Sequence, residues 1–220
     1  MFLTLLKKIY KKGYHEGPFS QEGEDLILDE LHEHTSFGCY VDIGAFDPWK
    51  YSNTALFYKR GWSGVNIDPR PGFKKTFDIE RPRDSNLECA IGLTKTPLRY
   101  YQFEEPALNT LSEKRAKFLL KNTNYKLKNI QKVKVVTLEA VFKKFCLNNV
   151  DFLNIDVEGT ELTVLRSGNW KKYRPKYIVI EILNTPFQEV TKNPCIKMMA
   201  NHGYELLTKG LRSVILKTKK

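Results

Sequence analysis

The chain has 220 residues, of which 41% are hydrophobic and 28% charged, a composition typical of an ordinary globular protein. Its apolar runs fall well short of the ~20 residues of a membrane span. The short apolar stretch at Met1–Leu6 is followed, not preceded, by its charges, which argues against a signal peptide and predicts a cytoplasmic protein. Widely spaced cysteines without a C-x-x-C pair exclude a zinc ribbon and predict reduced thiols: Cys39, Cys89, Cys146 and Cys195.

The formal net charge of +11 is the most unusual property of the composition. Such a charge attracts anionic partners, which include nucleic acid, an acidic lipid surface and a phosphorylated substrate. The lysines are spread along the whole chain, so a solvated surface without a dedicated partner is an equally good interpretation.

The first residues form a basic, amphipathic pattern. Apolar residues recur at helical spacing over residues 1–12, with lysines opposite them, which predicts a short helix. This helix could contact the inner face of an acidic membrane, or pack on the rest of the chain or on a second subunit. Glycines at 13 and 17 then interrupt the pattern. We therefore expect an N-terminal segment over residues 1–17 and a single domain over residues 18–220.

Strand-like and helix-like segments alternate from residue 39 onward. Residues 104–130 are polar and weakly periodic, and we expect a loop with one helix that helps form an acceptor pocket. The predicted helices are 21–34, 52–60, one opening near Pro71, 111–121, 137–146, 159–167 and 192–201. The predicted strands are 39–45, 63–68, 86–91, 98–103, 133–136, 150–157, 176–183, 204–208 and 213–217.

This order of elements predicts the fold class. Alternating strands and helices form right-handed parallel crossovers with helices on both faces of the sheet. Only four residues join the strands at 204–208 and 213–217, which is too few for a parallel crossover. We expect an α/β, doubly wound, Rossmann-like sheet that is mainly parallel and ends in a C-terminal antiparallel hairpin.

Acidic residues stand at the ends of the predicted strands, where open α/β sheets bind their ligands. Asp42 and Gly44 lie at the first strand-to-helix turn, without the G-x-G-x-x-G that a dinucleotide requires. The acid favours a cofactor with a positively charged amino acid end. Asp68 ends the next strand and is suited to ribose hydroxyls, although an Asp-Pro turn is the simpler interpretation of that residue alone. Asp156 ends a later apolar strand, and Glu161 nearby is expected to cap a helix.

Several blocks in this order resemble the FkbM family of S-adenosylmethionine-dependent methyltransferases. The more specific blocks are Ser20-Gln21-x-Gly23-Glu24-Asp25 and Asp156-Val157-Glu158-Gly159-Thr160-Glu161. The others are Val41-Asp42-Ile43-Gly44-Ala45, Ser52-Asn53-Thr54, Gly61-Trp62-Ser63-Gly64, Ile67-Asp68-Pro69, Ala90-Ile91-Gly92, Asp151-Phe152-Leu153-Asn154-Ile155 and Val179-Ile180-Glu181. Two departures are Asp68, where many relatives carry Glu, and Phe46-Asp47-Pro48, where Asn-Asp-Gly is more usual. The resemblance implies the class I methyltransferase fold.

The resemblance also implies S-adenosylmethionine as cofactor and a set of residues around it. Asp42, Gly44 and Ala45 would line its methionine end, Asp68 its ribose, and Cys89 and Ala90 its adenine. Asp156 would lie near the transferred methyl group, and Gln21 and Glu24 would close the site. The full set of expected cofactor contacts is Gln21, Glu24, Asp42, Gly44, Ala45, Phe46, Asp68, Pro69, Cys89, Ala90 and Asp156.

The expected reaction is O-methylation of a sugar hydroxyl in a glycan or glycolipid precursor, an acceptor that could be anionic. A hydroxyl is a poor nucleophile, so Asp156 or Glu158 would act as general base. Alternatively, Asp156, Glu158 and Glu181 would hold Mg²⁺. The rivals are a nucleic acid methyltransferase and a non-catalytic binding module with a basic surface. The Asp/Asn-Pro-Pro-Tyr motif common in base methylation is absent after the strand at 150–157, so we expect no nucleic acid partner.

Overall fold

The computed structural model describes residues 18–183 and 185–219. The helix expected over residues 1–12, and its membrane or protein contacts, lie outside the described residues. Within the described part of the chain, no helix is long and apolar enough to cross a membrane.

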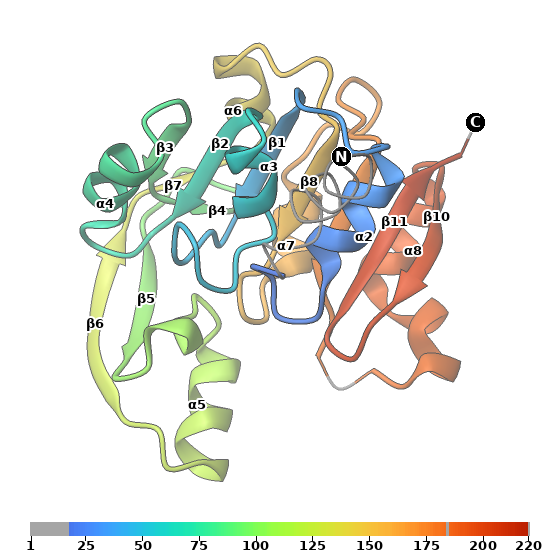
Figure 1. Ribbon diagram of the computed structural model, residues 1–220. Coiled ribbons are helices and arrows are strands. Elements are labelled where there is room, and N and C mark those ends of the chain that lie inside the picture. The colour runs from blue at the N-terminus through green and yellow to red at the C-terminus, as the bar shows by residue number, and fades with distance from the viewer. Residues whose placement is uncertain (1–17, 184, 220) are drawn as a thin grey trace, which may run out of the picture.

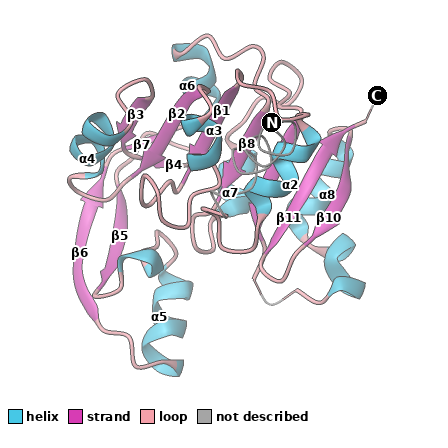
Figure 2. Ribbon diagram, in the orientation of Figure 1, coloured by secondary structure: helices cyan, strands magenta, loops and turns pink. Residues whose placement is uncertain are grey.

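A seven-stranded sheet forms the centre of the described residues (Figures 1 and 2). Its spatial order is β10 (Tyr204–Lys209), β11 (Ser213–Thr218), β9 (Tyr177–Glu181), β8 (Phe152–Ile155), β1 (Cys39–Ile43), β2 (Ser63–Asp68) and β3 (Ser85–Glu88). The strands from β9 to β3 are parallel, whereas β11 pairs antiparallel with both β9 and β10. This arrangement confirms the predicted class I methyltransferase-like sheet with its C-terminal hairpin.

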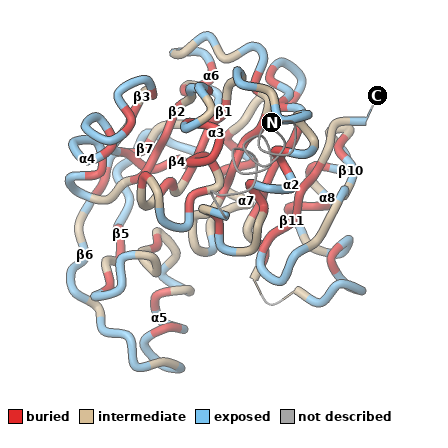
Figure 3. Tube along the Cα trace, in the orientation of Figure 1, coloured by how far each residue is buried: buried red, intermediate tan, exposed pale blue. Residues whose placement is uncertain are grey.

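Alternate residues of the strands face two different hydrophobic cores, as the period of a strand requires. The larger core joins residues such as Val41 and Leu153 to the helices α6 (Leu138–Lys144), α7 (Glu161–Arg166) and α8 (Pro194–Asn201). The second core joins Tyr40 and Phe152 to α2 (Glu24–Leu31) and α3 (Ala55–Lys59). Helix α4 (Phe73–Glu80) packs beside β3, and the 3-10 helix η2 (Phe187–Lys192) precedes α8. Figure 3 shows the central strands buried between these layers.

Two predicted elements differ clearly in the structure. The strand expected over 86–91 is divided, because Ala90 and Ile91 form β4 and pair in parallel with β7 (Val135–Val136) outside the central sheet. The first helix begins at Glu24 and not at residue 21, and its N-cap is Gly23. Ser20 Oγ accepts a hydrogen bond from the Gly23 amide at 2.9 Å in the turn that precedes this helix.

The segment 104–130 contains more structure than the expected loop and helix. Strand β6 (Leu127–Val133) pairs antiparallel with β5 (Leu98–Phe103), and between them lie the short 3-10 helix η1 (Pro106–Leu108) and α5 (Glu113–Asn122). We refer to residues 98–133 as the arm. It extends away from the central sheet at the lower left of Figure 1, and its surface is largely exposed in Figure 3.

Candidate active site

A pocket lies at the carboxyl ends of β1, β2 and β8, where the order of the strands reverses along the chain. Its walls come from residues 42–46 at the end of β1, 67–69 at the end of β2, 89–91, 154 and 156–158. Residues 106–111 of the arm, Gln21, Tyr51 and Arg212 cover it from the other side. The pocket therefore contains every residue expected from sequence to contact the cofactor except Glu24.

Gly44 fixes the first turn of the pocket. Its φ is +83°, a region that favours glycine, and a Cβ at this position would lie 1.6 Å from the carbonyl oxygen of Asp156. The turn after β1 thus packs directly on the backbone that follows β8. The neighbouring strand end therefore requires a glycine at this position.

The Asp42 carboxylate is buried beside this turn, and both of its oxygens accept hydrogen bonds from the protein. Thr54 Oγ1 donates to one oxygen and Asn154 Nδ2 to the other, each at 2.8 Å. Burial raises the pKa of Asp42, and these two hydrogen bonds oppose that shift. Asp42 therefore stabilises the turn and the adjacent strand end while its side chain forms part of the pocket wall.

The same face of the sheet carries a row of buried polar side chains. Asp42 on β1 lies in register with Asn154 on β8 and with Asn66 on β2. Asn66 lies in register in turn with Asn86 on β3. The fully buried Arg81 donates to Thr54 Oγ1 at 2.7 Å, next to Asp42. Most polar atoms of this network are hydrogen-bonded, since an unpaired buried polar group is costly, but among the described residues Asn66 Oδ1 and Arg81 Nε have no partner.

Asp68 is the last residue of β2 and lies at the adjacent wall of the pocket. One of its oxygens accepts from the Arg70 amide at 2.7 Å, and burial raises its pKa. The Arg70 guanidinium donates to the carbonyl oxygen of Phe46 and stacks on the Phe46 ring, 5.0 Å from its centroid. Phe46, whose φ is +42°, and Pro69 also line this wall.

Cys89 and Ala90 lie at the end of the pocket formed by β4 and the arm. Both are buried, and Tyr100 of β5 lines the same region. Burial raises the pKa of the Cys89 thiol to about 11, so it stays protonated and apolar at neutral pH. The result is a largely apolar wall at the opposite end from Asp156.

Three carboxylates meet where the pocket reaches the ends of β8 and β9. Carboxylate oxygens of Asp156, Glu158 and Glu181 lie within 4.8 Å of one another. Burial is the largest cause that raises the pKa of Asp156, to about 8, and the negative charge of Glu158 adds to it. Burial and then the negative charge of Asp156 raise the pKa of Glu181 to about 11, and the hydrogen bond between Glu181 and Asp156 favours the ionised form of Asp156.

Two contacts from the arm hold Glu158, which has a φ of +53°. Arg115 of α5 donates to its Oε2 from Nη2 at 2.9 Å and from Nε at 3.2 Å. Thr110 Oγ1 donates to its carbonyl oxygen at 2.8 Å. Nearby, Glu161 lies in the first turn of α7, as expected, and accepts from the Gly159 amide at 2.8 Å, just before the helix.

Gln21 and Arg212 close the pocket from segments far apart in sequence. Arg212, at the tip of the hairpin between β10 and β11, donates to Gln21 Oε1 at 3.3 Å. Glu24 lies farther back, where it accepts from Ser213 Oγ at 2.7 Å and lines a small adjoining cavity together with Glu181 and Asp156. Glu24 and Glu181 therefore belong to the neighbouring cavity and not to the wall of the main pocket.

Arg115, Arg212, Thr110, Tyr51 and Tyr100 are site residues that sequence reasoning did not identify. They come from the arm, the hairpin tip and the loop after β1, and none of them belongs to a recognisable short motif. Asn154 stands in register with Asp42 on the adjacent strand, a pairing that the structure shows and the sequence alone does not.

Comparison with known protein families identifies the family to which the chain belongs. Residues 42–206 match the family model described as the Methyltransferase FkbM domain. The chain belongs to the FkbM family of S-adenosylmethionine-dependent methyltransferases. No curated protein sequence matches the chain.

Solved methyltransferase structures are distantly similar. A TehB-like SAM-dependent methyltransferase from Corynebacterium glutamicum has 11% identity and a TM-score of 0.44, with 100% of this chain and 96% of that chain covered. The Burkholderia thailandensis 1,6-didemethyltoxoflavin-N1-methyltransferase has 10% identity and a TM-score of 0.44, with 100% of this chain and 89% of that chain covered. The O-methyltransferase from Bacillus cereus has 14% identity and a TM-score of 0.41, with 91% of this chain and 82% of that chain covered. The family assignment rests on the family model, because the similarity to these solved structures is too low to distinguish one family from another.

Proposed function

We propose that this methyltransferase transfers the methyl group of S-adenosylmethionine to a sugar hydroxyl of a glycan or glycolipid precursor. The observation that carries the proposal is the position and ionisation of Asp156. Its carboxylate lies at the end of β8, in the wall of the pocket, and burial raises its pKa to about 8. A base with a pKa near the working pH is the one that general base catalysis favours.

In the reaction that we propose, the acceptor hydroxyl attacks the sulfonium methyl group and loses its proton to Asp156. The carbon–oxygen bond forms as the carbon–sulfur bond breaks, and S-adenosylhomocysteine leaves. Glu181, protonated and hydrogen-bonded to Asp156, holds the carboxylate in place. Arg115 fixes Glu158 beside it. Alignment of the hydroxyl with the methyl group supplies much of the remaining rate.

The positions of the other pocket residues suit the cofactor that the family uses. Asp68 has one oxygen committed to the Arg70 amide, and its other oxygen could accept from ribose hydroxyls. The apolar wall of Cys89, Ala90 and Tyr100 suits a flat adenine ring. Asp42 gives the floor of the pocket a negative charge that would attract the amino group of the methionine end.

Asp156 in its ionised, reactive form favours a neutral hydroxyl acceptor over nucleic acid. A phosphate backbone brought against the ionised Asp156 and Glu158 would be repelled. Arg212 and Arg115 neutralise part of that charge, and the Arg212 side chain at the rim can contact an anionic group elsewhere on the acceptor. A phosphorylated sugar therefore remains compatible with the pocket as long as its hydroxyl, and not its phosphate, faces Asp156.

The same three carboxylates also fit Mg²⁺, which prefers oxygen ligands and is commonly held by carboxylates. Asp156, Glu158 and Glu181 would hold it, and the ion would lower the pKa of the acceptor hydroxyl. A thermal unfolding midpoint that rises with Mg²⁺ in the wild type, but not in Asp156→Asn, would support this role. Full activity in EDTA with no shift in unfolding favours direct base catalysis by Asp156.

The proposal is tested by identifying the methylated product. Purified protein would be incubated with isotopically labelled S-adenosylmethionine and, separately, with nucleotide sugars, glycolipid extracts, oligosaccharides and RNA. We expect label on a sugar oxygen, located by mass spectrometry of the product. Comparison of glycans from cells with and without the protein would then identify the natural acceptor. Transfer to RNA, or to nitrogen or carbon in any acceptor, would refute the proposed chemistry.

A further inference from the structure

The arm carries a large share of the positive charge of the chain. Residues 98–133 contain eight Lys or Arg and three Glu, a formal net charge of +5 out of the +11 of all 220 residues. Arg115 is committed to Glu158, and Lys117 pairs with Glu113 at 2.6 Å. Among the described residues, five arm lysines have no ion-pair partner: Lys114, Lys121, Lys126, Lys128 and Lys132.

The arm has its own small core and therefore presents most of its surface outward. Helix α5 packs on the β5–β6 ribbon through Ala116 and Leu119, which contact Tyr101 and Phe103. In Figure 1 the ribbon and α5 extend beyond the rest of the molecule, and Figure 3 shows most of this surface exposed. A surface that projects in this way can contact a large, flat partner without a clash with the central sheet.

Apolar side chains are interspersed with these lysines. Four of them are each 46–50% exposed: Phe118, Leu120, Tyr125 and Ile130. On α5, Phe118 stands four residues after Lys114 and three before Lys121, so these side chains share one face of the helix. Along β6, the exposed residues Lys128, Ile130 and Lys132 alternate with less exposed ones, apart from Asn129. This combination of cations and half-exposed apolar groups is typical of surfaces that lie on a lipid interface.

We propose that the arm is a binding surface for a bilayer that contains anionic phospholipid. The lysines would contact the headgroups, and Phe118, Leu120, Tyr125 and Ile130 would enter the interface. Juxtamembrane lysines contribute to such binding through the negative surface potential of the lipid. Nucleic acid fits this surface less well, because the unpaired cations of the arm are almost all lysine and the apolar side chains would have no partner on a phosphate backbone.

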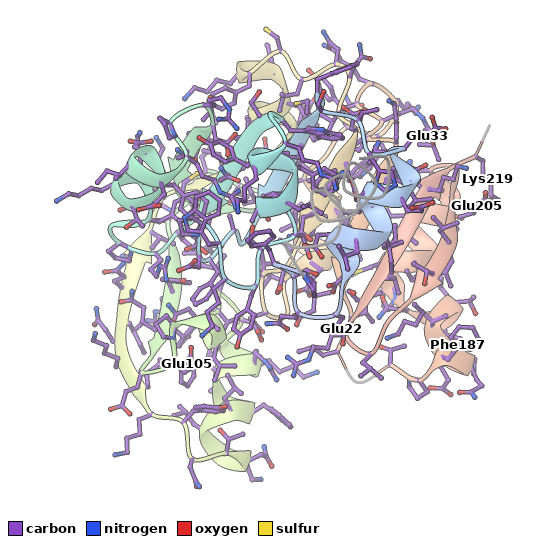
Figure 4. All side chains as sticks on the ribbon, viewed as in Figure 1. Glu22, Glu33, Glu105, Phe187, Glu205 and Lys219 are labelled. Atoms are coloured by element: carbon purple, nitrogen blue, oxygen red, sulfur yellow. The ribbon has the colours of Figure 1, made fainter. Side chains whose placement is uncertain are left out.

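The arm also connects this surface to the active site. Residues 106–111 line the cofactor pocket, and Arg115 contacts Glu158. An open groove beside that pocket runs between the arm residues Glu105 and Tyr125, and Glu22, Lys50 and Leu211 on the other side. Figure 4 shows Glu22 and Glu105 from these two segments at the lower side of the molecule. A bilayer on the arm would thus lie near the entrance through which a lipid-linked acceptor could reach the pocket.

Vesicle co-sedimentation of the full-length protein tests the proposal. The probes are phosphatidylcholine vesicles with and without phosphatidylglycerol, and an RNA oligonucleotide. The arm variant changes Lys114, Lys121, Lys126 and Lys128 to Gln, and the control variant changes the exposed Lys75, Lys143, Lys171 and Lys197 to Gln, with equal loss of charge. A further variant, Leu120→Ser with Tyr125→Ser, removes apolar contacts alone. Unchanged thermal unfolding confirms that each variant is folded.

We expect wild type to bind only the vesicles that contain phosphatidylglycerol. Each arm lysine should contribute about fivefold, so the arm variant should bind at least about 100-fold more weakly. The control should stay within a few-fold of wild type, and the Leu120/Tyr125 variant should bind vesicles more weakly but RNA equally well. Equal binding by the arm and control variants would overturn the proposal and leave the segment 1–17 as the candidate. Absence of binding to anionic vesicles, or tighter binding of RNA that depends on the arm lysines, would overturn it as well.

Discussion

Arg115 and Glu158 lie 43 residues apart in the chain, and the Arg115 Nη2 lies 2.9 Å from the Glu158 Oε2. The ion pair is largely shielded from solvent, with 19% and 14% of the two side chains exposed. It joins the arm to the acidic segment after β8, where Glu158 has a positive φ. The arm therefore holds a part of the active site in position.

Replacement of Arg115 should slow the reaction more than it weakens cofactor binding. Arg115→Gln removes a charge-assisted hydrogen bond worth ~1.5–3 kcal/mol, so we expect kcat to fall about 10- to 100-fold. Arg115→Lys should recover part of this, because it restores the charge without the two-point contact. Steady-state kinetics and calorimetry with S-adenosylhomocysteine measure the two effects. The neighbouring variant Lys114→Gln is the control, and equal kcat values for both variants would show that Arg115 does not position Glu158.

Gly44 and Gly72 offer a matched test of how the pocket is built, because both have a φ of +83°. A Cβ on Gly72 has nothing within 4 Å, whereas one on Gly44 would overlap the Asp156 carbonyl. Gly72→Ala should cost only the ~1–2 kcal/mol of the left-handed conformation. Gly44→Ala should cost about 3 kcal/mol or more beyond that, which corresponds to roughly 10 °C in the unfolding midpoint. Equal midpoints for the two variants in thermal denaturation would contradict the close packing of the turn on β8.

The position of Asp68 predicts a role in cofactor affinity. Asp68→Ala should weaken S-adenosylmethionine binding by about 10- to 100-fold, since hydrogen bonds to a charged group are worth ~1.5–3 kcal/mol. Calorimetric titration gives the dissociation constant, and circular dichroism checks the fold. Asp78→Ala, an exposed carboxylate on the following helix, provides the control and should leave affinity unchanged. An unaltered dissociation constant for Asp68→Ala would remove this residue from the cofactor site.

The central sheet could be predicted because its strands are apolar runs bounded by turns. The predicted connection of four residues between its last two strands is too short for a parallel crossover, so these strands had to be antiparallel. The arm could not be predicted in this way. The sequence of the strand Leu127–Val133 is Leu-Lys-Asn-Ile-Gln-Lys-Val, and its apolar residues show no regular period. The strand is stabilised by a local core that includes Phe103 and Leu119, and this core is not apparent from the strand's own sequence.

In the candidate site, too, some residues could be predicted from the sequence and others could not. Asp42, Asp68 and Asp156 were predictable because parallel strands bring their carboxyl ends to one edge of the sheet. Arg115 and Arg212 were not, because Arg115 contacts Glu158 from the arm and Arg212 lines the pocket from a hairpin tip. Their contacts with Glu158 and Gln21 depend on how distant segments pack, which a local motif does not contain.

The raised pKa of Asp156 predicts opposite effects of pH on activity and stability. A base must be ionised, so kcat/KM should fall about tenfold per unit below about pH 8 and level off above it. The folded protein holds this proton more tightly than the unfolded chain, so the free energy of unfolding should fall as pH rises from 3.8 towards about 8. Rate profiles and thermal unfolding over this range measure both. A flat rate profile between about pH 6 and about pH 9 would contradict an ionisation of Asp156 in this range.

The most direct test of the proposed chemistry compares Asp156→Asn with wild type in a methyl-transfer assay and a cofactor titration. Asn preserves the size of the side chain and one acceptor oxygen but cannot take a proton, so we expect kcat to fall ~10²–10⁴-fold. The dissociation constant of S-adenosylmethionine should change by no more than a few-fold. Asp47→Asn is the matched control, because Asp47 Oδ1 accepts from the Trp49 and Lys50 amides and an Asn can do the same. A near-normal kcat in a folded Asp156→Asn protein would contradict the role of Asp156 as the base.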